Sequence, residues 1–175
     1  SMKRPERPRQ STTGSRPERT PIAPIVLMPA KTHVSQNSGD AARLLNILNA
    51  DPKEVYLNDL IEAEDLCVLF GLEGGGKSYF LMLMSIVLAT GGNWYGKLVA
   101  PKPRRVLYVP TEGSEYDIAE RFEYPWSHFV ESQSLITKNW SYWIPPRLDL
   151  SKPSGVKLLK EAAKGYDVVF IDSLY

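Results

Sequence analysis

Eight residues near the middle of the chain carry the most specific chemistry in the sequence. Residues 71–78 read GLEGGGKS and match the pattern G-x-x-x-x-G-K-[ST]. The glycines permit backbone angles that turn successive N–H groups inward, so that the chain can approach an anion closely. Lys77 offers a compact charge to the β- and γ-phosphates of a nucleotide, and the Ser78 hydroxyl suits Mg²⁺. These residue types predict a phosphate-binding loop for ATP and Mg²⁺. The residues predicted to contact the nucleotide are Gly71, Glu73, Gly74, Gly75, Gly76, Lys77, Ser78 and Tyr79.

Two carboxylates each follow a short apolar run, where the strands of a parallel sheet end. Asp172 comes directly after residues 168–171, VVFI, and is predicted to hold the water shell of Mg²⁺. A strand-ending aspartate that caps a turn is the alternative, which the upstream loop makes less attractive. Glu112 follows RVLYVPT and is the candidate base that polarises a water for attack on the γ-phosphate. A surface glutamate beside Gly113 is the other interpretation.

The predicted elements place these residues in an α/β fold with a mostly parallel sheet. Short apolar runs at 66–70, 105–109, 140–144 and 167–171 predict strands, and the first two are expected to be buried on both faces. The intervening segments 77–90, 114–131 and 154–164 predict helices. Ser114 is expected to begin the second helix, and Pro125 to end or kink it. Strand, helix and strand in alternation indicate crossover connections.

Composition divides the chain into a tail and one globular domain. Residues 1–37 contain six prolines, and residues 1–31 hold seven Lys/Arg against two Glu. We expect this basic, Pro-rich tail to be disordered; it is either a solvated arm or a contact to nucleic acid or acidic lipid. Residues 38–175 form the predicted ATPase domain, opening with a short amphipathic helix at 39–49. The lone Cys67 excludes disulfides and, with no membrane-spanning run, favours a reducing cytoplasm.

Together these motifs resemble the RecA-like ATPases of the KaiC, DnaB and plasmid RepA group, most closely the RepA-type helicase and phage or plasmid ATPase branch. The resemblance covers residues 57–174. It rests on the quoted loop, on GGNWYGKLV at 91–99, on RVLYVPTEGS at 105–114, on Arg121 and on VVFIDSLY at 168–175. It implies that Glu112 is the catalytic glutamate and Asp172 the Walker B aspartate. Trp94 is either a packing residue or a ligand stacker, and Arg121 either orients the Glu112 region or is a plain helix-face arginine.

The resemblance also implies a departure at the end of the chain. In this family further strands, a sensor residue, DNA-contacting loops and an intersubunit arginine finger follow the Walker B strand, and the next strand lies between the Walker A and Walker B strands. The sequence stops just past its last predicted strand, which suggests a chain truncated after Walker B. We therefore expect the two halves of the site to face a missing central strand, with unpaired backbone groups.

Three functions remain open at this stage. The first is an oligomeric, hexamer-type motor that hydrolyses ATP on single-stranded DNA in replication or repair. The second is a KaiC-like signalling ATPase that never touches DNA, and the third is a nucleotide-binding scaffold without turnover. The basic segment 97–105 is either a DNA-facing loop or, because of Pro101 and Pro103, a solvated connector.

Overall fold

Three parallel strands form the centre of the fold. The computed structural model describes residues 26–29, 41, 46 and 49–173. Strand β7 (Val106–Pro110) lies between β8 (Trp140–Tyr142) and β9 (Val168–Asp172), and both neighbours run parallel to it. All five residues of β7 are buried, because the strand is paired on both edges and covered on both faces. The predicted parallel sheet is thus confirmed.

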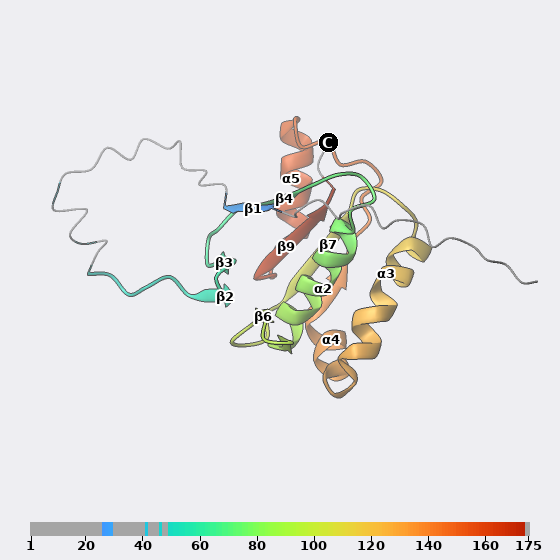
Figure 1. Ribbon diagram of the computed structural model, residues 1–175. Coiled ribbons are helices and arrows are strands. Elements are labelled where there is room, and N and C mark those ends of the chain that lie inside the picture. Colours follow the sequence, from blue (N-terminus) through green and yellow to red (C-terminus); the bar gives the residue numbers. More distant parts are fainter. Residues whose placement is uncertain (1–25, 30–40, 42–45, 47–48, 174–175) are drawn as a thin grey trace, which may run out of the picture.

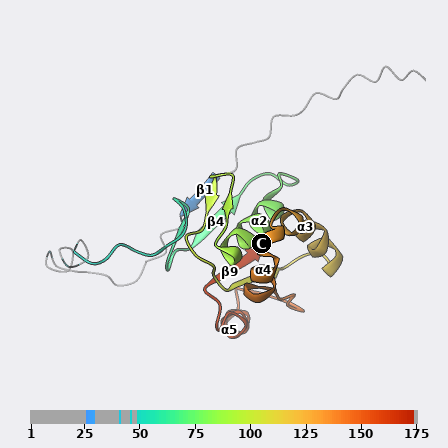
Figure 2. The same ribbon diagram turned by 90° about the horizontal axis from the view of Figure 1, so that it is seen from below.

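Helix α2 (Lys77–Thr90) is the core of the domain and has the bounds that the sequence predicts. Its residues from Met82 to Thr90 are all buried, and it contacts β7, β9, α3 and α4. The helix ends at Gly91, which adopts φ 63° and donates its N–H to Leu88. Figure 2 shows α2 and α3 on one side of β9 and α5 (Pro153–Ala162) on the other, so the sheet is a layer between helices.

Helix α3 (Glu115–His128) differs from its prediction in one respect. It begins as expected at Ser114, whose hydroxyl accepts from the N–H of Asp117 while the Asp117 carboxylate accepts from the N–H of Ser114. Pro125 does not end it, since the helix continues to His128 with Pro125 buried inside it. The expected helix to residue 131 is replaced by a 3₁₀ turn, η1 (Val130–Ser132), and by α4 (Gln133–Asn139), which the sequence did not predict.

Strand β4 (Cys67–Phe70) corrects the expectation of a fully buried strand. Its partner is not the parallel sheet but β1 (Val26–Pro29), which runs antiparallel to it (Figure 1). Val68 and Phe70 keep 38% and 48% of their surface exposed, because no strand of the parallel sheet lies against them. Strand β1 lies inside the stretch that composition predicts to be disordered; the rest of residues 1–37 and most of the helix expected at 39–49 lie outside the described residues.

Two short hairpins complete the described part of the chain. Strands β2 (Val55–Leu57) and β3 (Ile61–Glu62) form one antiparallel pair, and β5 (Asn93–Trp94) and β6 (Leu98–Val99) form the other. The hairpins are joined by the Asn58 side chain, which accepts from the N–H of Val99 at 2.6 Å. None of the described helices is long and apolar enough to cross a membrane.

Candidate functional site

The loop between β4 and α2 has the backbone shape that an anion cradle requires. Gly74 and Gly76 adopt φ 71° and 77°, a left-handed conformation that residues with a Cβ rarely tolerate. A Cβ built on either glycine would meet nothing within 4 Å, so the loop leaves open space on that side. Gly76 directly precedes the first residue of α2, and no side chain caps the helix. The positive end of the helix is therefore free to face a phosphate group.

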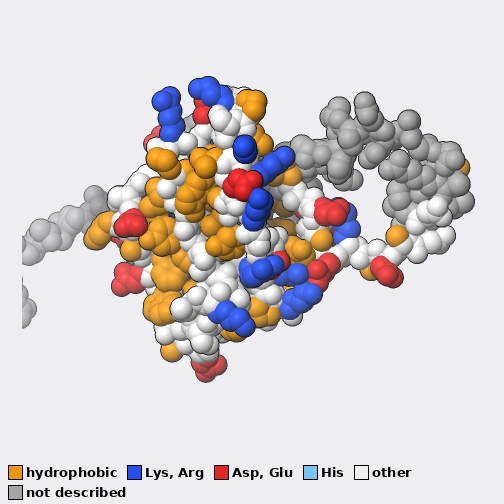
Figure 3. All heavy atoms as spheres, turned by 180° about the vertical axis from the view of Figure 1, so that it is seen from behind, with side chains coloured by type: hydrophobic (Ala, Val, Ile, Leu, Met, Phe, Trp, Pro, Cys, Tyr) orange, Lys and Arg blue, Asp and Glu red, His pale blue; other side chains and the backbone are white. Residues whose placement is uncertain are grey.

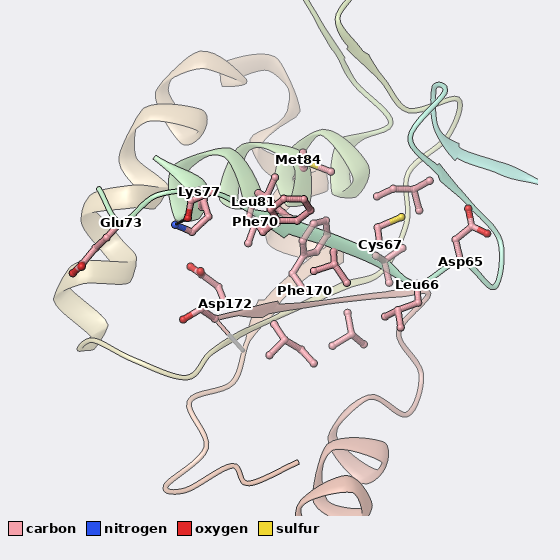
Figure 4. Close-up of a pocket in the computed structure, with 18 residues that line it drawn as sticks. Asp65, Leu66, Cys67, Phe70, Glu73, Lys77, Leu81, Met84, Phe170 and Asp172 are labelled. Carbon is pink, nitrogen blue, oxygen red and sulfur yellow. Dashed lines mark hydrogen bonds between the residues drawn. The ribbon is translucent and has the colours of Figure 1, made fainter. Parts of the chain in front are cut away.

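Lys77 folds back over this loop. Its ammonium group donates to the carbonyl oxygens of Gly71 and Leu72 at 2.9 and 2.8 Å. In Figure 4, Lys77 and Asp172 point toward one another across the end of a pocket, whereas Glu73 points away from it. If a phosphate lay over the loop, the Lys77 ammonium could donate to its charged oxygens in place of the neutral carbonyl oxygens of Gly71 and Leu72. Hydrogen bonds between two charged groups are the stronger type.

Asp172 is the point at which four elements meet. Its Oδ1 accepts a hydrogen bond from the Ser78 hydroxyl of α2 at 2.9 Å, although the two residues are 94 positions apart in the chain. Its Oδ2 accepts from the Tyr108 hydroxyl of β7 at 2.5 Å and lies 3.7 Å from Nη1 of Arg121 on α3. The carboxylate is buried, and these three partners compensate the burial of its charge. The structure thus brings together Ser78 and Asp172, the two residues predicted to hold Mg²⁺.

Tyr108 is the residue at this site that sequence reasoning missed. Its side chain is fully buried, and its ring lies 6.0 Å from that of Trp140. Burial, followed by the hydrogen bond to Asp172, raises the pKa of the Tyr108 phenol well above its usual value, so the hydroxyl stays protonated as a donor. The one signal in the sequence is a polar group at the centre of an apolar strand, RVLYVP, because a buried hydroxyl needs a partner.

The sequence left two roles open for Arg121: to orient the Glu112 region, or to be a plain arginine on the helix face. In the structure its guanidinium is directed at Asp172, and its side chain is 24% exposed. It is therefore not a plain solvent-facing arginine. The carboxylate that it faces is that of Asp172 rather than that of Glu112.

Glu112 lies in the exposed turn between β7 and α3. The turn is fixed at the edge of the sheet where Asp172 lies, because the N–H of Thr111 donates to the Asp172 carbonyl at 2.8 Å and its hydroxyl bonds to Ser173. Glu112 and Asp172 are thus at the carboxyl ends of neighbouring parallel strands, where ligands of α/β sheets bind. Tyr79, the last of the predicted loop residues, has 51% of its surface exposed on the first turn of α2.

A pocket of about 630 Å³ separates β4 from β9 beneath the loop (Figure 4). Most of its lining is apolar, and Phe70, Leu81 and Phe170 face it from β4, α2 and β9. Its polar end is formed by Lys77 and Asp172. Within the described residues β4 and β9 share no ladder, so the two halves of the site face one another across this space.

The basic segment after β5 is tied to the protein's own carboxylates. Lys102 and Arg104 both pair with Glu54, Arg104 at 2.7 Å, and hydrogen bonds from Arg104 and then Lys102 lower the pKa of Glu54 to about 2. The Arg104 guanidinium also lies over the Tyr56 ring, and Arg105 pairs with Asp167 at 3.3 Å. These contacts favour the connector over the DNA-facing loop.

Trp94 packs against the hydrophobic core and is half-buried. Its ring meets that of Tyr95 edge-on at 5.3 Å. This environment supports the packing role and not the role of a ligand stacker.

Comparison with known proteins places this site in a family. A family model described as an AAA domain matches residues 40–175, which is most of the chain. The chain belongs to the AAA domain family. A search of curated proteins gives no match. The matched region of the AAA domain contains the glycine loop, Glu112 and Asp172 and identifies a P-loop ATPase-type domain that binds nucleotide.

The residues of this AAA domain fit the nucleotide and Mg²⁺ that the family implies. Open space beside the left-handed glycines suits phosphate oxygens, and the ammonium of Lys77 lies over the same loop. A hydroxyl and a carboxylate oxygen 2.9 Å apart, from Ser78 and Asp172, are the hard oxygen donors that Mg²⁺ prefers. Mg²⁺ keeps several waters and is held by few protein ligands, so two protein oxygens beside the phosphates are sufficient.

The hydroxyl of Tyr108 is expected to stabilise the AAA domain more than a matched surface hydroxyl does. Tyr108→Phe keeps the ring but leaves the buried Asp172 carboxylate short of a donor, which should lower the free energy of unfolding by roughly 1–3 kcal/mol. Tyr142→Phe is the control, since its hydroxyl donates to the exposed Glu115 at 2.9 Å, and should change stability by less than about 0.5 kcal/mol. Urea denaturation measures both; equal losses would contradict the role of the buried bond.

Proposed function

We propose that this AAA domain binds and hydrolyses ATP as part of a RecA-like oligomeric motor on single-stranded DNA, of the replicative helicase or phage and plasmid replication–repair kind. The contact between Ser78 and Asp172 at the end of the phosphate loop carries the nucleotide part of the proposal. It joins the first turn of the loop helix to the end of β9, so both sides of a Mg²⁺–nucleotide site are in place. The motor part rests on the sequence resemblance to the RepA-type branch.

Each residue has a defined task in this proposal. Lys77 and the loop N–H groups bind the β- and γ-phosphates, and Lys77 neutralises charge that develops on the γ-phosphate during transfer. Ser78 and Asp172 hold Mg²⁺, which supplies electrostatic stabilisation of the phosphate oxygens when bound. Tyr108 and Arg121 keep the Asp172 carboxylate in its orientation through Oδ2, so that Oδ1 faces Ser78.

Glu112 acts on the attacking water. Its exposed position in the turn after β7, next to the end of β9, leaves its carboxylate free to orient a water in line with the γ-phosphate and to accept the proton. The resemblance implies that an arginine of an adjacent subunit completes the site in a hexamer-type ring. Turnover by a single chain would then be slow, and activity would rise with assembly.

A nucleotide-binding scaffold or a KaiC-like signalling ATPase is the second candidate. The observation that favours it is the separation of β4 from the parallel sheet, since the phosphate loop and Glu112 lie on elements that share no ladder within the described residues. Such a domain would bind nucleotide through the same loop. It would differ in turnover and in DNA binding; the Lys77 experiment below tests the loop that both candidates share, and the Glu112 and DNA experiments distinguish them.

Lys77→Ala is expected to weaken ATP binding by at least about a hundredfold, because the phosphate charge loses its charged partner, a loss of roughly 3 kcal/mol. Lys97→Ala removes an exposed lysine from the β5–β6 turn and serves as the control with unchanged affinity. A fluorescent ATP analogue titrated into both variants gives the two constants. Retained affinity in Lys77→Ala would refute the phosphate-loop assignment.

Glu112→Gln is expected to abolish ATP turnover while ATP affinity stays within about twofold, because the amide cannot accept the proton of the attacking water. General-base catalysis typically contributes about 10²–10⁴-fold, and phosphate release should fall by that factor. Glu115→Gln, on the first turn of α3, is the matched control. Absence of turnover in the unaltered chain, even at concentrations that favour assembly, would support the scaffold.

Single-stranded DNA is expected to bind the AAA domain at low salt and to dissociate as salt rises, since contacts to phosphates release counterions. Fluorescence anisotropy of a labelled oligonucleotide over a salt series measures this, with the duplex of the same sequence for comparison. A linear fall of log affinity with log salt supports the motor. No binding at low salt would favour the signalling ATPase.

A further inference from the structure

The outer face of α3 carries three exposed rings and one carboxylate at a spacing of four residues. Tyr116, Glu120, Tyr124 and His128 follow one another along one side of the helix, and all are exposed. Tyr116 and Tyr124 expose 78% and 55% of their surface, which is unusual for large aromatic side chains on a single helix. Neither the nucleotide site nor the core uses this face, because α3 packs inward through Ile118 and Pro125.

The β5–β6 turn continues the row beyond the end of α3. Tyr95 exposes 71% of its surface, and its ring lies 5.2 Å from that of His128. His128 in turn stacks on Tyr124, with ring centroids 6.1 Å apart and an angle of 18° between the planes. Tyr95 also meets the half-buried Trp94 edge-on, with ring centroids 5.3 Å apart, and its backbone adopts φ 50°. We call Tyr95, Tyr116, Glu120, Tyr124 and His128 the ring row.

The surroundings of the ring row are acidic. Residues 112–131 contain six carboxylates and one cation other than His128, and that cation, Arg121, is directed at Asp172. Glu115, Glu120 and Glu123 are all exposed on α3. In Figure 3 the left edge of the molecule carries acidic and hydrophobic side chains, whereas the Lys and Arg side chains lie at its top, centre and lower right, with further acidic side chains among them. This face would repel the phosphates of a nucleic acid and attract a cation-rich peptide.

The chain itself contains such a peptide. Residues 1–25 hold six Lys/Arg against two Glu, and residues 4–9 read RPERPR. Pro-rich segments bind aromatic-lined surfaces in the extended polyproline II form, and arginine stacks on tyrosine faces while it pairs with neighbouring carboxylates. The row from Tyr116 to His128 spans about 18 Å at 1.5 Å per residue. A polyproline II segment rises about 3.1 Å per residue, so about six residues, the length of RPERPR, match that span.

We propose that the ring row is a docking site for the Pro- and Arg-rich N-terminal segment of the same chain, with residues 4–9 lying along α3. Because residues 10–25 link this segment to the domain, its effective concentration at the ring row is in the millimolar range. Several weak ion pairs and stacking contacts are therefore enough to keep it bound. Residues 10–25 extend to at most about 55 Å, which is ample for a domain of this size. The docked segment would cover α3 beside Glu112 and Asp172 and so tie the basic tail to the nucleotide site.

Disulfide cross-linking in the full chain tests the proposal. In a Cys67→Ala background, Glu6→Cys is paired either with Ala119→Cys, exposed on α3 beside the ring row, or with Lys157→Cys, exposed on α5. Docking predicts that the α3 pair oxidises at least about tenfold faster than the α5 pair, as the local concentration of the segment is higher there. The product should be a monomer on a non-reducing gel.

Two further variants show whether the contact is the one proposed. Glu120→Lys with Glu123→Lys reverses the charge in and beside the ring row, and Tyr116→Ala with Tyr124→Ala removes its two tyrosine rings on α3; each should bring the α3 rate down to the α5 rate. All four positions are exposed, so thermal melting should show an intact fold. Equal rates for the two pairs, no effect of the charge reversal, or a cross-linked dimer, which would assign the row to a second copy, would each overturn the proposal.

Discussion

The burial of the Asp172 charge is the constraint on which the candidate site depends. A buried carboxylate is tolerated only with donors around it, and here α2, β7 and α3 each contribute one. Because the three donors come from different elements, the position of the carboxylate also fixes those elements relative to β9. The same interactions that stabilise the fold therefore orient the group that is proposed to hold Mg²⁺. Stability and function are coupled at a single side chain.

The sequence predicts the local part of this arrangement well. The bounds of α2 follow from an apolar run between a glycine-rich loop and Gly91, and the start of α3 follows from the Ser114 capping box. The pairing of Ser78 with Asp172 is also predictable, because the loop pattern and the strand-ending aspartate point to one metal site. Such features depend on residues close in the chain or on chemistry that only a few residue types can perform.

The remaining features depend on contacts between distant residues. The role of Tyr108 is set by what faces its hydroxyl in the folded protein, and an apolar run with one tyrosine does not reveal that. The exposure of Val68 and Phe70 follows from the partner of β4, and the sequence pattern of a strand does not name its partner. The sequence leaves segment 97–105 open between a DNA-facing loop and a solvated connector, and neither interpretation predicts that Arg104 is buried. It pairs with Glu54 and lies over the Tyr56 ring, about fifty positions away in the chain.

Pro125 gives α3 a property that its unbroken span from Glu115 to His128 conceals. Proline has no N–H, so the carbonyl oxygen of Arg121, four residues earlier, cannot receive the usual hydrogen bond of an α-helix. The ladder thus lacks one hydrogen bond in the turn from Arg121, which faces Asp172, to Pro125, and Tyr124 lies within that turn. A bend in this turn would cost no further backbone hydrogen bond. Mechanically, α3 is two short rods that meet in the turn from Arg121 to Pro125, and the ring row crosses from one rod to the other.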